Sequence, residues 1–225
     1  MNPPLQTADR GMRILLVDHG CCDPPGTRIH ALRAGLEAAG CTVAVCGPST
    51  ANAFEEQPAG MHGIHLHDVA AASRRFLAAV RDGTPEALLR VVPTVPAGLL
   101  GLARETARQI IAEAADAIFP DAIFVLHAGI LADLAVETGA PVVVHVSAVD
   151  LDAAAERPSL KRLVLSALGS SDHLVAADEA VAARLTEWLD DEERSRSEVW
   201  PLDAAAAPRV AEACRLALAR RRGER

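Results

Sequence analysis

Short apolar runs alternate along the chain with longer segments in which apolar residues recur every three or four positions. A run of four to six apolar residues predicts a strand covered on both faces, whereas the longer spacing predicts an amphipathic helix. Strands are expected at 13–17, 42–46, 63–66, 122–126, 141–146, 173–176 and 198–200. Helices are expected at 27–39, 70–81, 85–91, 97–115, 129–137, 159–168, 178–188 and 207–222. The alternation predicts an α/β fold built on a single Rossmann-like, doubly wound parallel sheet.

The predicted elements form one domain, with a different segment at each end. Residues 1–11 are expected to be a disordered leader, 12–203 the Rossmann-like domain, and 204–225 a C-terminal helix. The partial apolar stripe of that helix consists of Val210, Cys214, Leu216 and Leu218. Such a stripe would let the helix dock back onto the sheet. The acidic, serine-rich run 190–197 is expected to be a mobile loop.

Charge and cysteine content narrow the possible partners and compartment. The net charge of −8 argues against a nucleic-acid partner, because phosphate binding needs clustered cations. The five cysteines form no C-x-x-C pair and are expected to be reduced thiols in a cytoplasmic protein. No apolar run approaches the roughly 18 residues of a membrane span, so no transmembrane segment is expected. The opening MNPPLQTADRG lacks the apolar core of a secretory signal.

The turn after the first strand, HGCCDPPG, is the first place to look for a phosphate fingerprint. It lacks the G-x-G-x-x-G spacing of dinucleotide-binding folds, and the second strand ends VAVCGP without the acidic residue that would hold a ribose. The lysine of a P-loop and the G-x-S-x-G of a nucleophile elbow are also missing. These absences disfavour NAD, ATP and hydrolase functions, and no cofactor is expected.

Four segments, taken in order, resemble the first domain of the retaining glycosyltransferases of family four, which have the GT-B fold. That family begins with a strand, a Pro/Gly turn, a helix and a second strand, and a similar order is found in the opening segments RILLVDHG and PPGTRIHALRAGLEAAGCTVAVCGP. PDAIFVLHAGILADLAVETGAPVVVHVSAVDL resembles its PD-strand-His segment and the following P-V-V-x-x-x-H-G strand. SSDHLVAADEAVAARL and EVWPLD resemble its AD-strand-S-E segment and its exit from the first domain.

The resemblance implies an acceptor-binding domain without the domain that binds the nucleotide-sugar donor. Enzymes of the family have two Rossmann-like domains with the reaction cleft between them, and the second carries an E-x7-E motif; no such donor-side segment follows EVWPLD in this sequence. The first hypothesis is therefore the acceptor-side half of a glycosyltransferase, binding a sugar acceptor and working with a separate donor-binding subunit or as a homodimer. A second is a non-catalytic binding or scaffolding module that keeps the fold. A third is a small-molecule enzyme that uses this sheet alone.

The turn after the first strand supplies the candidate binding residues. They are His19, Gly20, Pro25, Gly26 and Thr27. Backbone N–H groups at the start of a helix favour an anion such as a phosphate, and the resemblance gives this loop contacts with donor phosphates or the acceptor. The alternative interpretation is an ordinary turn followed by a helix N-cap.

The candidate catalytic residues follow later strands. His127 matches the family's histidine after its PD-strand, and a histidine there would point into the crevice where such sheets bind ligands. Ser147 stands where the family has an active-site histidine, and His145 shares its strand face about 7 Å deeper. Asp150 matches a polar substrate-side position. Capping or loop-fixing roles remain the alternative for His127 and Asp150.

Histidines in the stretch MHGIHLHD also raise the question of a metal site. His65 and His67 would share one strand face, and Asp68 adds an oxygen ligand. A polar edge strand has the same composition, and a His-x-His pair has low specificity. No metal site is expected.

Overall fold

The computed structural model describes residues 11–22, 27–49, 58–203 and 205–223. The expected leader, apart from Gly11, lies outside the described residues. Pro25 and Gly26 of the candidate binding turn lie outside them as well. Every other candidate site residue is described.

Seven strands form one parallel sheet, in the order β3-β2-β1-β4-β5-β6-β7. The strands are β1 (Arg13–Val17), β2 (Thr42–Pro48), β3 (Met61–Ile64), β4 (Ala122–Val125), β5 (Val142–Val146), β6 (His173–Ala176) and β7 (Ser197–Val199). The order runs outward in one direction from β1 to β3 and in the other from β4 to β7. The predicted Rossmann-like, doubly wound sheet is thereby confirmed.

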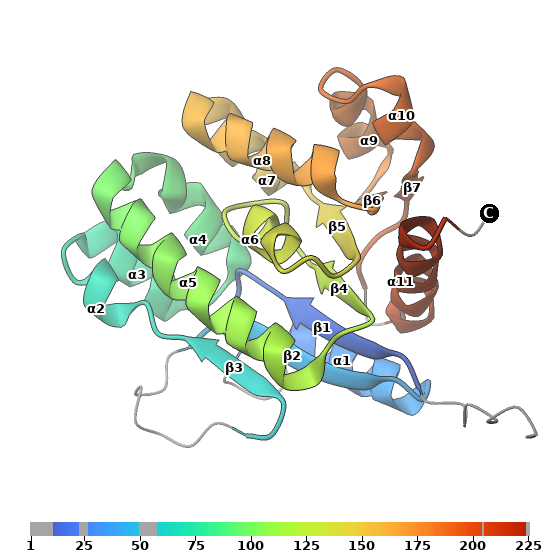
Figure 1. Cartoon of the computed structure of the whole chain (residues 1–225). Coiled ribbons are helices and arrows are strands. Elements are labelled where there is room, and N and C mark those ends of the chain that lie inside the picture. Colours follow the sequence, from blue (N-terminus) through green and yellow to red (C-terminus); the bar gives the residue numbers. More distant parts are fainter. Residues whose placement is uncertain (1–10, 23–26, 50–57, 204, 224–225) are drawn as a thin grey trace, which may run out of the picture.

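Helices cover both faces of the sheet (Figure 1). They are α1 (Arg28–Ala38), α2 (His67–Ala70), α3 (Arg74–Asp82), α4 (Pro85–Val91), the 3-10 turn η1 (Val92–Thr94), α5 (Ala97–Ile118), α6 (Ala132–Glu137), α7 (Ala148–Glu156), α8 (Pro158–Ser170), α9 (Glu179–Thr186), α10 (Asp191–Ser195) and α11 (Ala207–Arg221). Helices α1 and α11 pack on one face, and α5, α6, α8 and α9 pack on the other. Within the described residues, none of these helices has the length and apolar character needed to cross a membrane.

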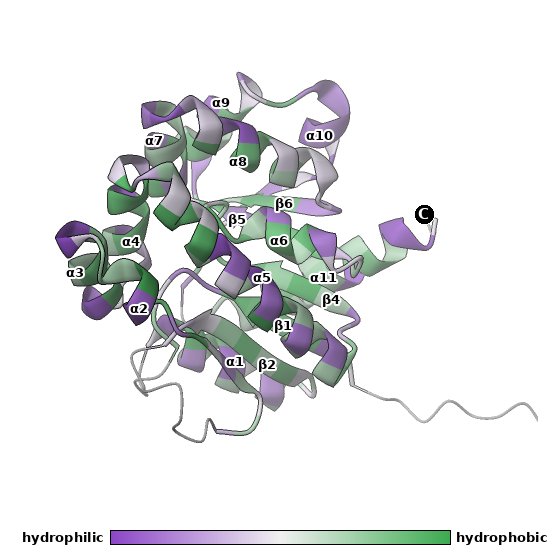
Figure 2. Cartoon of the chain, turned by 60° about the vertical axis from the view of Figure 1, so that its left-hand side comes forward, coloured by the Kyte–Doolittle hydropathy of each residue, from purple (hydrophilic) through white to green (hydrophobic). Residues whose placement is uncertain are grey.

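Alternation along each strand divides the core between the two faces. Leu15 and Val17 of β1 join the cluster under α5, whereas Ile14 and Leu16 join the cluster under α1 and α11. All four side chains are fully buried, as expected for a strand whose two faces are both covered by helices. Figure 2 shows the hydrophobic strands lying between helices that carry their polar residues outward.

The last helix lies on the sheet. Val210, Cys214 and Ala217 of α11 are completely buried, and the helix contacts β4, β5, β6 and α1. A side chain on Gly35 of α1 would meet Ala207 Cβ at 2.7 Å, so a glycine there allows the two helices to approach closely. The described residues of the C-terminal segment therefore belong to the same packed unit as the sheet.

Segments 148–156 and 190–197 differ from the sequence prediction. Residues 148–156, left unassigned between a predicted strand and helix, form α7, because Ser147 and Asp150 close its first turn through a hydrogen bond from the Ser147 N–H to the carboxylate. The run expected to be a mobile loop, 190–197, instead forms α10 and the start of β7. Asp190 and Glu193 each accept the other's backbone N–H, which satisfies the free donors of a helix start.

Strands β1 and β4 lie side by side although the chain leaves β1 toward β2. At such a reversal of strand order the two following loops diverge, and a crevice opens at the carboxyl ends of the strands. The residues that follow β1, β4 and β5 meet at this edge.

Candidate functional site

Polar residues follow three adjacent strands at the carboxyl edge of the sheet. Asp18 and His19 follow β1, His127 follows β4, and Ser147 and Asp150 follow β5. His19, His127 and Asp150 are each about 1% exposed. A buried polar group must find a partner inside the protein or lose free energy, so the contacts of these residues define the site.

The carboxylate of Asp150 is the hub of the cluster. Its Oδ2 accepts hydrogen bonds from the Ser147 Oγ at 2.7 Å and from the Ser147 N–H at 2.8 Å. The same oxygen lies 3.3 Å from Nδ1 of His127. The other oxygen, Oδ1, is buried and has no hydrogen-bond partner among the described residues.

Arg28 fixes the protonation of His127. Its guanidinium Nη2 lies 2.9 Å from Nε2 of His127. A guanidinium only donates hydrogen bonds, so Nε2 must be the unprotonated acceptor and Nδ1 must carry the proton toward Asp150. The result is a hydrogen-bonded series, Arg28 to His127 to Asp150, that runs from an exposed cation to a buried anion.

The charges of the cluster shift the pKa values of its central pair. Burial by itself would lower the pKa of His127, but the negative charges of Asp150 and Asp18 raise it above its ordinary value against a smaller opposing effect of Arg28. Burial by itself would raise the pKa of Asp150, but His127 and the two hydrogen bonds from Ser147 lower it. Each group therefore favours the charged form of the other.

His19 is held from the opposite side by the loop before α6. Its Nε2 accepts the backbone N–H of Leu131 at 3.2 Å, so its Nδ1 carries the proton. Burial, with the nearby His127, lowers the pKa of His19 to about 4. Its ring meets that of His127 edge to face, with the centroids 6.0 Å apart.

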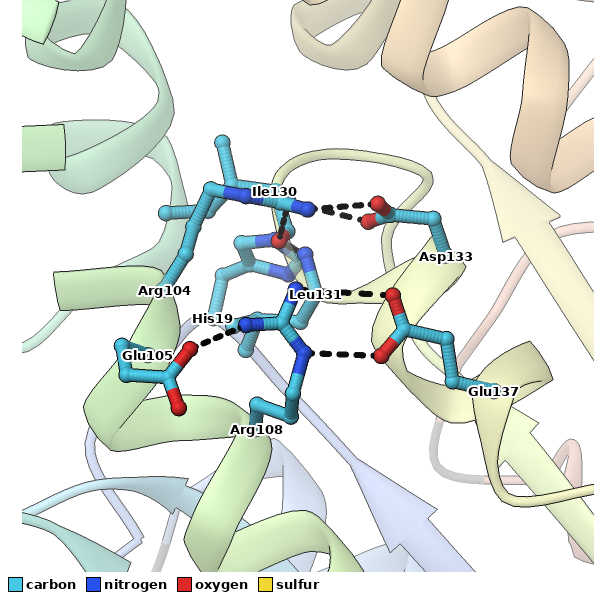
Figure 3. A network of polar contacts seen from close by, with 8 residues as sticks. All are labelled: His19, Arg104, Glu105, Arg108, Ile130, Leu131, Asp133 and Glu137. Atoms are coloured by element: carbon cyan, nitrogen blue, oxygen red, sulfur yellow. Dashed lines mark hydrogen bonds and ion pairs between the residues drawn. The ribbon is translucent and has the colours of Figure 1, made fainter. Parts of the chain in front are cut away.

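Two arginines of α5 pair with acidic residues of α6, and the first of them also holds the loop that contacts His19 (Figure 3). Arg104 donates to the carbonyl of Ile130 at 2.6 Å and to both oxygens of Asp133, at 3.0 and 2.5 Å. One turn further along α5, Arg108 pairs with Glu137 of α6 at 2.8 Å. The contact of Arg104 with the Ile130 carbonyl positions the Leu131 N–H that His19 accepts, whereas Arg108 only joins α5 to the end of α6.

His145 lies deeper in the sheet than the rest of the cluster. Its Nδ1–H donates to the carbonyl of Leu126 at 3.1 Å, and its ring centroid lies 6.3 Å from that of Trp200. Nε2 is therefore an acceptor, and it has no partner among the described residues. Burial lowers the pKa of His145 to about 4, so the ring is neutral at physiological pH.

A pocket of about 350 Å³ opens beside the cluster. Its lining includes Asp18 and Gly20 after β1, Thr27 and Arg28 at the start of α1, and Glu86 of α4. A side chain on Gly20 would meet the Pro85 ring at 2.9 Å, so a glycine is needed where the turn passes under α4. The volume lies at the lower end of the range for small-molecule sites.

The structure thus brings most of the predicted site residues to one edge, with different surroundings. His127, Ser147 and Asp150 contact one another, and His19 packs against His127. Gly20 and Thr27 line the pocket, whereas His145 does not line it and bonds the Leu126 carbonyl. Sequence reasoning missed Asp18 and Arg28. The dipeptide Asp18-His19 directly after an apolar strand was the available signal for the first, and nothing in the sequence singled out Arg28.

The histidines of the MHGIHLHD stretch lie elsewhere. His62 belongs to β3, and burial lowers its pKa despite the nearby Glu113 of α5. His67 opens α2 instead of continuing the strand, so it does not share a strand face with His65. Across the described ranges, no three His, Cys, Asp or Glu side chains group closely enough to hold a metal ion.

No family model matches this chain, and no curated protein matches it in sequence. Among solved structures, a sucrose-phosphate synthase chain from Thermosynechococcus elongatus is similar over 91% of this chain and 98% of its own, with a TM-score of 0.58 at 12% identity. A UDP-GlcNAc 2-epimerase from Neisseria meningitidis, bound to UDP-GlcNAc, gives a TM-score of 0.47 at 14% identity, over 84% of this chain and 46% of its own. The glycosyltransferase SsfS6 from Streptomyces sp. SF2575 gives 0.42 at 18%, over 73% and 50%.

This chain spans about half the length of the epimerase and of SsfS6, but almost the whole of the synthase chain. The fold assignment rests on the synthase, which has the higher TM-score. The chain therefore has the Rossmann-like fold of the GT-B glycosyltransferases.

Proposed function

We propose that this protein is the acceptor-side half of a GT-B glycosyltransferase of the family-four type. In this proposal it binds a sugar acceptor at the carboxyl edge of its sheet and works with a separately encoded subunit that binds the nucleotide-sugar. The observation that carries the proposal is the Asp150–His127 pair, which stands at the reversal of strand order beside the pocket.

The pair has the arrangement of a general base and the group that orients it. Asp150 accepts the Nδ1 proton of His127, which leaves Nε2 as the basic atom on the side of Arg28 and the pocket. A carboxylate in this place fixes the tautomer and stabilises the imidazolium that forms when Nε2 takes a proton. Asp150 contacts His127 on its Nδ1 side, away from the basic Nε2, so its role in this proposal is to position His127.

Sugar transfer needs a group of this kind. The acceptor hydroxyl loses its proton as its oxygen bonds to the anomeric carbon of the donor sugar, while the bond from that carbon to the nucleotide diphosphate breaks. Nε2 of His127 would take the proton, and the diphosphate would leave with the bonding electrons. Base catalysis of this kind contributes about 10²- to 10⁴-fold to a rate.

A second wall of the cleft would supply the donor. The described residues at the carboxyl edge provide acid–base groups and the pocket beside α1, but Arg28 is the only cation among the residues that line this pocket. A nucleotide diphosphate needs more positive charge or more helix N-termini than this. A separate donor-binding subunit would provide them, and a second copy of this chain in a homodimer is the other possible source.

Immunodepletion and add-back would test the proposal. The protein is removed from an extract of the cells that make it, and transfer of radiolabelled sugar from UDP- and GDP-sugars is measured before and after. Depletion should abolish one transfer activity, and purified wild-type protein should restore it. The variant His127→Asn should restore less than about 1% of that activity, because it lacks a basic nitrogen at the Nε2 position. Arg108→Met, on the far end of the Figure 3 network, is the matched control and should restore activity fully.

The second candidate function, a non-catalytic module, is favoured by one observation. His127 is almost completely buried, and its Nε2 is already occupied by Arg28. If His127→Asn restores the depleted activity as well as wild type does, the pair is structural and the module interpretation holds. If depletion removes no transfer activity, the glycosyltransferase proposal is wrong.

A further inference from the structure

Arg28 is an exposed cation with an unusual partner. It is the first residue of α1, it lines the pocket, and its guanidinium donates to the imidazole of a buried histidine instead of to a carboxylate. Within the described part of the chain no salt bridge joins it to any Asp or Glu. A guanidinium in a pocket without a carboxylate partner is a group that can bind an anion.

The contact also blocks the chemistry that His127 could perform. Nε2 has one lone pair, and the N–H of Arg28 occupies it at 2.9 Å. Once Nε2 takes a proton, it becomes a donor that faces another donor, so the contact exists only with the neutral imidazole. A substrate hydroxyl can therefore reach the basic nitrogen only after Arg28 has moved away.

We propose that Arg28 is a substrate-released latch: one oxyanion on the acceptor, a phosphate monoester in size and charge, binds the guanidinium and thereby frees Nε2 of His127. The proposal rests on the acceptor-side function above and adds the chemical class of the acceptor. A neutral sugar offers no group that competes well for a guanidinium, whereas a phosphate forms paired, charge-assisted hydrogen bonds with it.

Other pocket residues limit the ligand to a single anionic group. The first turn of α1 contains no acidic residue, and the Thr27 Oγ1 beside Arg28 is buried without a partner among the described residues. Both features favour an oxyanion next to Arg28. The carboxylates of Asp18 and Glu86 line the same pocket and would repel a second negative group. A nucleoside diphosphate should accordingly bind less well than a sugar monophosphate.

Histidine ¹⁵N NMR on the full chain tests the latch without any transfer assay. The charged and titratable groups around His127 are Asp18 after β1, His19, Arg28 of α1, His145 of β5 and Asp150 of α7. Of these, only Arg28 is expected to move, and its departure together with the arrival of an anion should raise the pKa of His127. Glucose 6-phosphate should therefore raise that pKa by about 0.5–1 unit and shift the Nε2 resonance, whereas glucose should not.

Two variants and two ligands decide the outcome. Arg28→Met should weaken glucose 6-phosphate binding about ten- to a hundredfold and remove its effect on His127, while Arg28→Lys should retain part of both. Arg90→Met is the matched control, an exposed arginine of the neighbouring helix α4 that does not line the pocket, and should bind as wild type does. Tighter binding of UDP than of glucose 6-phosphate, or unchanged binding in Arg28→Met, would overturn the latch. Neither result depends on sugar transfer, so the latch and the proposed function can fail separately.

Discussion

Replacing His145 by Asn should change how the stability of the protein depends on pH. The substitution keeps a side-chain N–H for the Leu126 carbonyl and removes the buried imidazole. In the native protein burial lowers the pKa of that imidazole from 6.5 to about 4. The unfolded chain therefore binds more protons between these two values, and the contribution of His145 to stability is complete above pH 6.5 and is lost as the pH falls toward 4.

The size of the effect follows from the two pKa values. At pH 4.5 the unfolded histidine is almost fully protonated while the native one is mostly neutral, which corresponds to about 2.5 kcal/mol of lost stability. At pH 7.5 this linkage vanishes, and the variant should be less stable than wild type by about 1–2 kcal/mol because it loses packing against Trp200. Between pH 7.5 and 4.5 the free energy of unfolding of the variant, relative to that of wild type, should therefore rise by about 2.5 kcal/mol.

Urea denaturation followed by circular dichroism at several pH values between 4.5 and 7.5 measures this difference. All carboxylates are common to both proteins, so their titration cancels to a first approximation. His67→Asn serves as control, and its difference from wild type should stay constant, because both proteins retain the buried imidazole of His145. A constant difference for His145→Asn as well would show that His145 is solvated or charged in the native state, which would refute the burial argument.

Two further comparisons test the framework around the site. Arg104→Met should lower the free energy of unfolding in urea by about 2–4 kcal/mol, because it removes a largely buried ion pair and leaves a carbonyl unsatisfied. Arg108→Met, whose ion pairs are exposed, should lower it by under about 1 kcal/mol. Equal losses for the two variants would contradict this. Gly129→Ala should destabilise by about 2 kcal/mol or more, since its methyl group would meet the His19 ring at 2.7 Å. Gly101→Ala is the control: its methyl group would enter open space on α5, and it should stabilise the protein by up to about 1 kcal/mol. A rise in melting temperature for Gly129→Ala would disprove the close contact at that glycine.

The inner strands were readable from the sequence because they are buried on both faces, which produces an unbroken apolar run, whereas the edge strand β7 is exposed. All seven begin within two residues of their predicted start, and the last and shortest, β7, begins one residue early. Helices α7 and α10 went unpredicted, and each begins with a pair of side chains that bond the backbone of its first turn. In α10, four consecutive acidic residues resemble a loop, and the helix forms because Asp190 and Glu193 satisfy each other's backbone N–H groups.

The sequence predicted most of the residues that lie at the candidate site, but not how they contact one another. His19, His127 and Asp150 stand out because each follows an apolar strand, and parallel strands place their carboxyl ends at one edge. Which of them touch is set by loop paths, and sequence spacing says nothing about that. Asp150 was expected to bind substrate, and the structure adds that its carboxylate contacts His127 and Ser147. Arg28 was not singled out at all, because an arginine at the start of an amphipathic helix is ordinary on its own.

The sequence by itself determined that this protein forms a parallel α/β sheet and which edge of the sheet gathers its polar residues. The period of the apolar residues and their position relative to each strand are local properties, so both can be read along the chain. Only the tertiary structure decided that Arg28, His127 and Asp150 form one hydrogen-bonded series, and that His145 lies beside Trp200. Those contacts join residues far apart in the chain, and only the assembled sheet, with α1 packed on it, brings them within hydrogen-bonding and ring-packing distance.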